Sequence, residues 1–264
     1  MGASMAAPGL VRSGRDRHDS QQHGNLSGLQ KGGASEVDTF DSEVTGLLSN
    51  QLDEPRSVLT TLDELINSGR LATYLKSLLV GRSSHRLEEI YAFEHPNGFT
   101  KVVLADRSGA WSLRLHYWPP GVGDVDIHSH RWHFASFVLK GTIQTSSHQV
   151  SVGTEFEMLD CFPSERGDYR MEHRGIVGLT TLIEQHHSTG DTYFHSLEGL
   201  HKASVETESF TMVLHGMDLL DHSTVIRRRH SQPRLQEGSS VVPNPRLRKL
   251  LEFSLGGLDG ERSK

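Results

Sequence analysis

The segment IHSHRWHFASFVLKG, residues 127–141, places three histidines within six positions, at His128, His130 and His133. Imidazole nitrogen is the commonest side-chain ligand for transition metals such as zinc, iron and nickel. If residues 128–139 form one β-strand, side chains alternate between its two faces. His128 and His130 then share a face and can converge on one metal ion, whereas His133 points away. A β-bulge would reverse this assignment.

Two imidazoles hold a transition metal weakly, so a metal site here needs a third ligand from another strand. The chain contains 17 histidines, and several of them lie in polar segments where solvent exposure is the simpler interpretation. We expect surface positions for His133, His148, His186 and His187. The number of histidines therefore does not identify the third ligand by itself.

The hydrophobic pattern from residue 99 onward is typical of β-strands, because its period is two and turn compositions such as DRSG and PPGVGD recur. About nine short strands with glycine-containing connections predict an antiparallel sandwich or a small barrel. The expected strands are residues 99–105, 111–118, 128–139, 142–152, 154–159, 169–172, 178–185, 192–197 and 210–217.

The flanks of this β-rich region have different compositions. Residues 57–69 and 70–81 carry apolar residues at helical spacing, which predicts two short amphipathic helices, and residues 85–93 are compatible with a third. The N-terminal region is rich in Gly, Ser, Gln and charge, and cannot bury enough apolar area to become ordered. The expected organisation is a disordered tail (1–45), a helical segment (46–95), a β-barrel (96–228) and a polar tail (229–264) compatible with a short helix, packed on the barrel or free.

The histidine segment resembles the first motif of the cupin superfamily, in which His-x-His on a strand precedes a glycine, here Gly141, eleven residues after the second histidine. The resemblance implies a cupin-type antiparallel β-barrel (a jelly roll). Its metal ion is held by the His-x-His pair, often a glutamate, and a histidine of a later strand. Phe134 stands at the glutamate position, so no carboxylate ligand is implied. The later histidine is His201 in SLEGLHKASVE, which resembles the second cupin motif without its proline and asparagine, with His195 or His215 as substitutes.

A site of three histidines, here His128, His130 and His201, is associated within the cupins with the thiol dioxygenases, of which cysteine dioxygenase is the best known. Two stretches look like that family, FTKVVLADRSGAWSLRLHYWPPGVGDVDIHSH and LHKASVETESFTMVLH. Together they cover residues 99–215. The resemblance implies a mononuclear Fe(II) site that acts with O₂ on a small anionic substrate, a thiol among the candidates.

Three departures from that family concern the substrate. Lys101 stands where the family has the arginine for the substrate carboxylate, and a lysine is a point charge, not a bidentate fork. Gly216 and Met217 follow His215, so the family's tyrosine is missing, and no cysteine follows His130 to form the family's cysteine–tyrosine crosslink. These departures argue against cysteine itself as the substrate.

Cationic and imidazole side chains remain for contacts with a substrate. Lys101 or Arg114 could pair with a carboxylate or phosphate of that substrate. Arg114 shares its strand face with His116 and Trp118, so all three would face the cavity together. His215 could act as an acid or base, or donate a hydrogen bond near the bound ligand, and a purely structural role is equally compatible.

Three functions are compatible with this pattern. The favoured one is a metal-dependent cupin enzyme, a mononuclear non-haem Fe(II) oxygenase of a small anionic substrate, because the glutamate ligand is missing. The second is a non-catalytic cupin that binds a small molecule or a metal and regulates a partner. The third is a redox-neutral isomerase or lyase that uses Zn, Ni or Mn. The fold does not choose among them, since one scaffold supports many chemistries.

Composition limits the partners and the compartment. The net charge of −6 argues against nucleic-acid binding, although residues 227–230 (RRRH) form a short basic run. The single cysteine, Cys161, excludes an intramolecular disulfide and fits a reducing compartment. No stretch has the ~20 apolar residues of a membrane span and no secretory signal is visible, so the cytoplasm is expected. The expected partner is a small-molecule substrate, with no nucleic acid and no membrane; a homodimer is compatible by analogy with other cupins.

Overall fold

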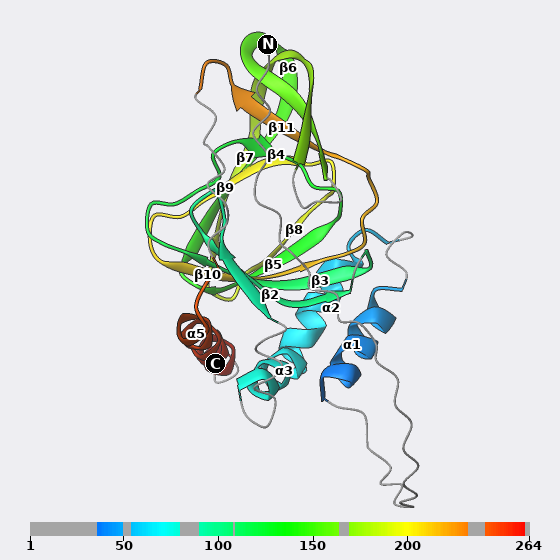
Figure 1. Ribbon diagram of the computed structural model, residues 1–264, viewed down its shortest axis with the longest axis vertical. Helices are drawn as coiled ribbons and strands as arrows, with labels where there is room; N and C mark the ends of the chain where they lie inside the picture. Colours follow the sequence, from blue (N-terminus) through cyan, green and yellow to red (C-terminus); the bar gives the residue numbers. More distant parts are fainter. Residues whose placement is uncertain are drawn as a thin grey trace, which may run out of the picture.

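The computed structural model describes residues 36–49, 54–79, 90–107, 109–163, 169–231 and 241–261. Two antiparallel β-sheets face each other as a barrel, and helices lie against the outer side of one sheet (Figure 1). The predicted fold class, an antiparallel β-barrel with short N-terminal helices, is confirmed.

One sheet has six strands in the order β1-β2-β3-β10-β5-β8, and the other has five in the order β11-β4-β9-β6-β7, with β11 also paired to β6. The six-stranded sheet comprises β1 (Tyr91–Glu94), β2 (Thr100–Arg107), β3 (Trp111–Trp118), β5 (Phe134–Lys140), β8 (Thr192–His195) and β10 (Ser209–His215). The five-stranded sheet comprises β4 (Ile127–His128), β6 (Thr142–Pro163), β7 (Tyr169–Ser188), β9 (Leu200–Ser204) and β11 (Ser223–Arg228).

The six-stranded sheet is covered on both faces. Strand β10 shows this most clearly, because all of its residues are buried. Met212 and Leu214 point outward and join the larger apolar core beneath the helices. Thr211, Val213 and His215 alternate with them and therefore point inward, toward the second sheet. The main apolar core thus lies outside the barrel, which leaves the inner face of this sheet free for polar residues.

The outer layer consists of helices on the described part of the chain: α1 (Glu36–Leu47), α2 (Ser57–Asn67), α3 (Arg70–Leu79) and α5 (Asn244–Glu261). The two amphipathic helices predicted for residues 57–81 are confirmed as α2 and α3. The C-terminal helix α5 is packed, because Leu247 and Leu251 are buried in the same core as Leu62 and Leu75.

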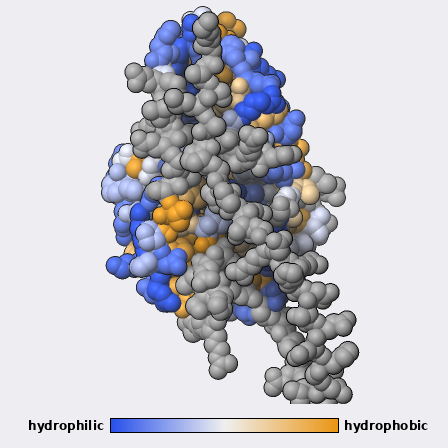
Figure 2. Space-filling view, viewed as in Figure 1, coloured by the Kyte–Doolittle hydropathy of each residue, from blue (hydrophilic) through white to orange (hydrophobic). Residues whose placement is uncertain are grey.

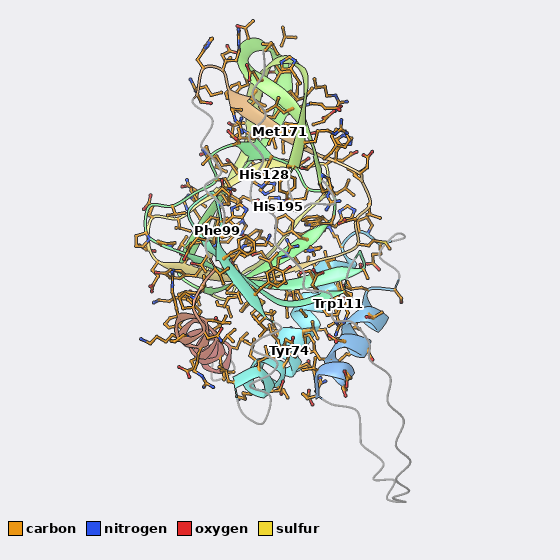
Figure 3. The ribbon with its side chains drawn as sticks, viewed as in Figure 1. Tyr74, Phe99, Trp111, His128, Met171 and His195 are labelled. Atoms are coloured by element: carbon orange, nitrogen blue, oxygen red, sulfur yellow. The ribbon has the colours of Figure 1, made fainter. Side chains whose placement is uncertain are left out.

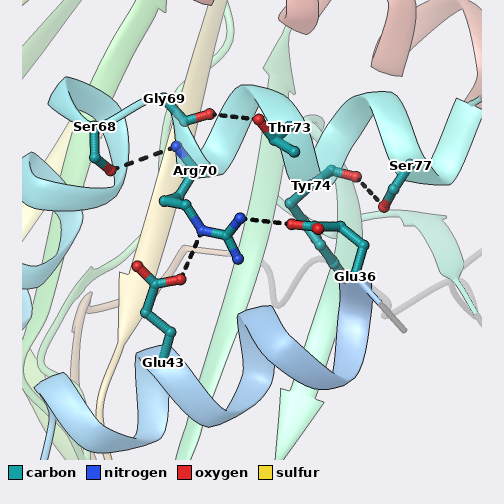
Figure 4. A network of polar contacts seen from close by, with 8 residues as sticks. All are labelled: Glu36, Glu43, Ser68, Gly69, Arg70, Thr73, Tyr74 and Ser77. Atoms are coloured by element: carbon teal, nitrogen blue, oxygen red, sulfur yellow. Dashed lines mark hydrogen bonds and ion pairs between the residues drawn. The ribbon is translucent and has the colours of Figure 1, made fainter. Parts of the chain in front are cut away.

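Charged and aromatic contacts fasten α1 to α3. Arg70 Nη1 lies 2.7 Å from Glu36 Oε1, and its Nε lies 2.7 Å from Glu43 Oε2 (Figure 4). The ring of Phe40 stacks on that of Tyr74 with centroids 4.1 Å apart. The ion pairs are partly exposed and contribute little by themselves, so the buried rings hold the two helices together.

Two predictions about the N-terminal part are wrong in the described residues. Residues 36–45, expected to be disordered, belong to α1, because the helix gains buried apolar area against α3; residues 1–35 lie outside the described residues. The third helix expected over residues 85–93 is contradicted at 91–93, which begin β1. Residues 80–89 lie outside the described part of the chain.

The strand expected over residues 128–139 is also wrong. Strand β4 ends at His128 in the five-stranded sheet, and β5 begins at Phe134 in the six-stranded sheet. Residues 129–133 therefore carry the chain from one sheet to the other. This crossing places the histidine segment between the two sheets.

Strands β6 and β7 are longer than expected and form a hairpin that rises beyond the barrel, with β11 beside its outer part (Figure 1). The strands expected over residues 142–152 and 154–159 are one strand with an irregularity after Ser151. The visible surface of this arm is mostly hydrophilic with scattered apolar residues (Figure 2). Strands β9 and β11 were not among the expected strands.

Candidate metal centre

Neighbouring strands of the five-stranded sheet bring two histidines together. His128 in β4 is the register partner of His201 in β9, and His130 follows in the segment that crosses between the sheets. Ring centroids lie 5.0 Å apart for His128 and His130, 4.7 Å for His128 and His201, and 5.0 Å for His130 and His201. One ligand nitrogen from each ring lies within 4.8 Å of the other two. The three side chains thus form one cluster that could hold a metal ion.

Backbone carbonyls fix the orientation of two of these rings. His128 Nδ1 lies 3.2 Å from the carbonyl oxygen of Asp126, and His201 Nδ1 lies 3.2 Å from that of Gly199. A carbonyl only accepts hydrogen bonds, so each Nδ1 must carry the proton and donate. Each Nε2 then keeps its lone pair free, which is the arrangement that metal-binding histidines use.

Burial also favours the metal-binding form of the rings. Desolvation, followed by the neighbouring histidines, holds the pKa values of His130 and His201 well below the usual imidazole range. Both rings are therefore neutral at neutral pH. Neutral imidazole is the form that binds a metal through its lone pair.

Phe134 and His195 form a wall beside the cluster. The Phe134 ring lies 4.9 Å from that of His130 and 5.7 Å from that of His201, measured between centroids. His195 stacks on His201 at 4.2 Å and on Phe134 at 5.0 Å, and Figure 3 shows it inside the barrel close to His128. Burial lowers the pKa of His195 to about 4. His195, an alternative third ligand in the sequence, therefore packs against His201 as a neutral ring.

The donor set suits a transition metal. Imidazole ligands favour zinc, copper, iron and nickel, whereas calcium and magnesium prefer oxygen. Within the described residues the cluster consists of histidines alone, with Phe134 at the position where a carboxylate would otherwise reach it. Three protein ligands leave coordination positions open for other molecules, as catalytic sites require.

A polar surface continues from this cluster along the inner face of the six-stranded sheet. Strand register arranges its side chains in rows across β2, β3, β10, β5 and β8. The row nearest the histidines is Asp106, Ser112, His215, Phe134 and His195. The next row is Val103, Arg114, Val213, Ser136 and Tyr193, and the third is Lys101, His116, Thr211 and Val138. Beyond the third row an apolar cluster closes the barrel: Phe99, Trp118, Val138, Ile143, Ala203 and Val205.

Both residues expected to bind substrate lie on this inner face. Lys101 Nζ lies over the ring of Phe93, 5.6 Å from its centroid. Arg114 lies over the ring of Trp132, 5.3 Å from its centroid, and its Nε donates to Ser112 Oγ at 3.2 Å. Burial lowers the pKa of Lys101 well below its usual value and also lowers that of Arg114. Burying two cations side by side disfavours charge on the lysine first.

His215 lies in the row nearest the metal cluster but is not part of it. Its ring stacks on Trp132 at 4.4 Å, and Trp132 in turn lies 5.6 Å from the ring of His130. His215 Nδ1 donates to the Gly216 carbonyl at 2.7 Å, so its Nε2 is a bare acceptor. Burial, followed by the nearby Arg114, holds the pKa of His215 far below the imidazole range.

The surface positions expected for two of the histidines are wrong, and one inward-facing tyrosine was not expected. His133 and His187, expected on the surface, are only 7% and 9% exposed. His133 Nδ1 accepts a hydrogen bond from the Leu197 amide at 3.2 Å, and His187 stacks on Tyr193 at 4.1 Å. Tyr193 was not among the candidate residues, and burial raises its pKa to about 12. The alternation within residues 192–195 was the available signal for that inward position.

The sequence matches no protein-family model and no curated protein. Among solved structures, the chain is similar to an RmlC-like cupin from Shewanella frigidimarina, with 14% identity, 49% of this chain and 86% of that chain covered, and a TM-score of 0.30. It is similar to the DMSP lyase DddQ from Ruegeria pomeroyi, with 15% identity, coverages of 47% and 50%, and a TM-score of 0.30. It is also similar to Drosophila melanogaster CENP-C bound to CAL1, with 9% identity, coverages of 57% and 96%, and a TM-score of 0.31.

Cupin structures stand among these matches. At such identities and TM-scores the likeness carries nothing about activity, substrate or partner. None of the helices on the described part of the chain combines the length and apolar character that a bilayer span requires.

Proposed function

We propose that this protein is a metal-dependent enzyme of the cupin type, a mononuclear non-haem Fe(II) oxygenase similar to the thiol dioxygenases, which acts on a small anionic substrate. One observation supports this proposal above the others. The cluster of His128, His130 and His201 lies beside an inner sheet face that carries the partly buried amino group of Lys101 and guanidinium group of Arg114.

The donor set favours a catalytic metal over a purely structural one, because three ligands leave coordination positions open. Three neutral imidazoles leave the charge of a divalent ion uncompensated, so an anionic substrate is attracted to it. An Fe(II) ion held there would supply redox chemistry with O₂. Zn, Ni or Mn in the same place would instead favour the redox-neutral alternative.

The chain's own groups have separate roles in this proposal. Lys101 and Arg114 attract and orient the anionic group of the substrate. His215 holds a free Nε2 lone pair next to Arg114, so it can accept a proton or a hydrogen bond from the substrate. The Phe134 ring and the apolar end of the barrel exclude water from the same space.

The test begins with metal content. Protein purified without chelators is expected to hold about one iron per chain, and His128→Ala is expected to lose it, because two imidazoles bind weakly. His186→Ala is the matched control, since that histidine is exposed on β7 and should leave the iron content unchanged. Metal analysis by mass spectrometry measures all three proteins.

Oxygen uptake then decides between functions. We expect the iron-containing protein to consume O₂ with at least one member of a panel of small thiols, amino acids and keto acids, and the His128→Ala variant to consume none. Zinc in place of iron, with no oxygen uptake, would instead indicate a redox-neutral enzyme. A full-length protein with no bound metal would contradict the proposal and leave a non-catalytic binding role.

A further inference from the structure

Unsatisfied polar atoms gather on the inner face of the six-stranded sheet. Buried side-chain atoms without a hydrogen-bond partner are few in the described residues, and they include His116 Nε2, Ser136 Oγ and His215 Nε2. All three belong to the rows described above, within two strands of one another. A buried polar atom without a partner costs about 1–3 kcal/mol, so such a concentration indicates a place that a guest molecule completes.

His215 defines one requirement for that guest. Its side chain is only 6% exposed, and its Nδ1 proton is committed to the Gly216 carbonyl. The remaining Nε2 is therefore an acceptor that needs a donor. Arg114 and Lys101 both carry donors, but neither makes a hydrogen bond to this atom in the described structure.

The two cations define the other requirement. In the described part of the chain, Arg114 contacts the Ser112 hydroxyl and the face of Trp132, and Lys101 lies over the face of Phe93. Neither forms a direct ion pair there, although the Asp106 carboxylate interacts with both at longer range. Arg131 is a useful contrast, because it lies over the same Trp132 ring at 5.1 Å but is neutralised by Asp218 at 2.8 Å. Arg114 and Lys101 therefore lack the directly contacting carboxylate that Arg131 has.

We propose that Lys101, Arg114, His116, Ser136 and His215, together the inner polar patch, bind a small anion that carries a separate hydrogen-bond donor. Arg114 and Lys101 take the anionic group, and His215 Nε2 accepts from a hydroxyl or amino group of the same molecule. That the bound anion is the enzyme's substrate rests on the proposed function. The binding of the anion itself depends only on the residues of the inner polar patch and does not need the metal.

The experiment measures binding of simple probes to the full chain by calorimetry, with the metal removed by chelator so that the probes cannot bind the ion. Acetate offers an anion without a donor, glycolate offers both, and inorganic phosphate tests the other common anion. Glycolate is expected to bind at least about tenfold more tightly than acetate, because only glycolate satisfies His215. Phosphate that binds more tightly still, with the same dependence on Arg114, would support the patch and identify phosphate as its anionic group.

Variants separate the two requirements. Arg114→Met is expected to weaken binding of acetate and glycolate alike by about tenfold or more, whereas Arg131→Met, which removes a cation from the same ring, should leave both within about threefold. His215→Phe keeps the stack on Trp132 and should abolish only the preference for glycolate. His215→Gln restores an acceptor and should recover part of that preference. Thermal unfolding confirms that each variant is folded.

The proposal is overturned if the chain binds none of the probes, if Arg114→Met and Arg131→Met lose affinity equally, or if His215→Phe keeps the preference for glycolate. These outcomes are independent of the iron measurement above. Iron without probe binding would remove this inference and the substrate-binding roles of Lys101, Arg114 and His215, but would leave the metal centre. Probe binding without iron would remove only the proposed oxygenase.

Discussion

At the scale of single residues, Phe134 separates this histidine cluster from one with a carboxylate ligand. Its ring is 8% exposed and lies within 4.9 Å of His130 and 5.7 Å of His201 between centroids. A side chain of similar length that ends in a carboxylate would reach the same centre. The residue therefore keeps the donor set neutral.

Replacing Phe134 with Glu is expected to make folding depend on metal. Without metal the buried carboxylate lacks a partner, and we expect a loss of about 2–5 kcal/mol in the free energy of unfolding. With saturating Fe(II) under anaerobic conditions, the gain should exceed the wild-type gain by about 1.4 kcal/mol or more, because a fourth ligand binds the ion at least tenfold more tightly. Urea unfolding with and without metal measures both.

Phe134→Leu is the control, since it loses packing and adds no ligand. If the Glu and Leu variants gain equally from metal, Phe134 does not face the ion, and the interpretation of this position as the missing carboxylate is wrong.

At the scale of elements, Gly141 makes the turn between β5 and β6. It has φ +83°, a region that favours glycine, and an added Cβ would lie 2.5 Å from the Glu208 carbonyl oxygen and also meet the Ser209 side chain. Gly109 has a similar φ of +80°, but its Cβ would meet nothing within 4 Å. The two glycines therefore differ in crowding and not in backbone conformation.

Replacing each glycine with alanine distinguishes the cost of backbone strain at positive φ from the cost of steric overlap by the added Cβ. Gly109→Ala is expected to lower the free energy of unfolding by about 1 kcal/mol through backbone strain alone. Gly141→Ala should lower it by about 1–3 kcal/mol more, because β10 must move away from the turn. Urea unfolding of both variants gives the difference; equal losses would show that the contact with residues 208–209 is not tight.

The elements also show what the sequence can predict. Periodicity is enough for α2 and α3, because their buried residues recur at helical spacing. It fails at residues 129–133, where the chain changes sheet and a period of two no longer applies. His128 and His130 do lie together, but through this crossing and not through alternation along one strand. His133 is buried for the same reason.

Other parts of the candidate site depend on pairing between distant strands. Motif resemblance singles out His201, whereas its position opposite His128 is set by the register of β4 and β9, which no local pattern encodes. His116 could be found from its shared face with Arg114. The approach of His195 to His201 and the stack of His215 on Trp132 could not, since they follow from how the two sheets close.

At the scale of the whole molecule, buried neutral histidines link stability to pH. His95 stacks on Phe99 at 4.3 Å, and its Nδ1 accepts from the Asn97 amide at 3.3 Å. Burial, followed by the charges of Lys101 and of nearby groups, lowers its pKa to about 3 from 6.5. The unfolded chain therefore binds more protons at this position between about pH 3 and pH 6.5, and the folded state loses stability as pH falls through that window.

Replacing His95 with Phe is expected to flatten this dependence. Below pH 6.5 the wild-type free energy of unfolding should fall more steeply than that of the variant, by up to one proton, or about 1.4 kcal/mol per pH unit. Above pH 7 the two curves should run parallel, which provides an internal control. Urea unfolding between pH 4 and pH 8 measures both proteins, and parallel curves throughout would show that His95 is protonated as readily in the folded state.

The two-sided burial of the six-stranded sheet has a consequence for how such a protein can change over evolution. Met212 and Leu214 pack against the helices, whereas Thr211 and His215 lie on the opposite face of the same strand, toward the second sheet. Substitutions in the second set can therefore change the lining of the barrel without removing the packing that holds the helices. Evolution can thus alter the interior at every other position of this strand.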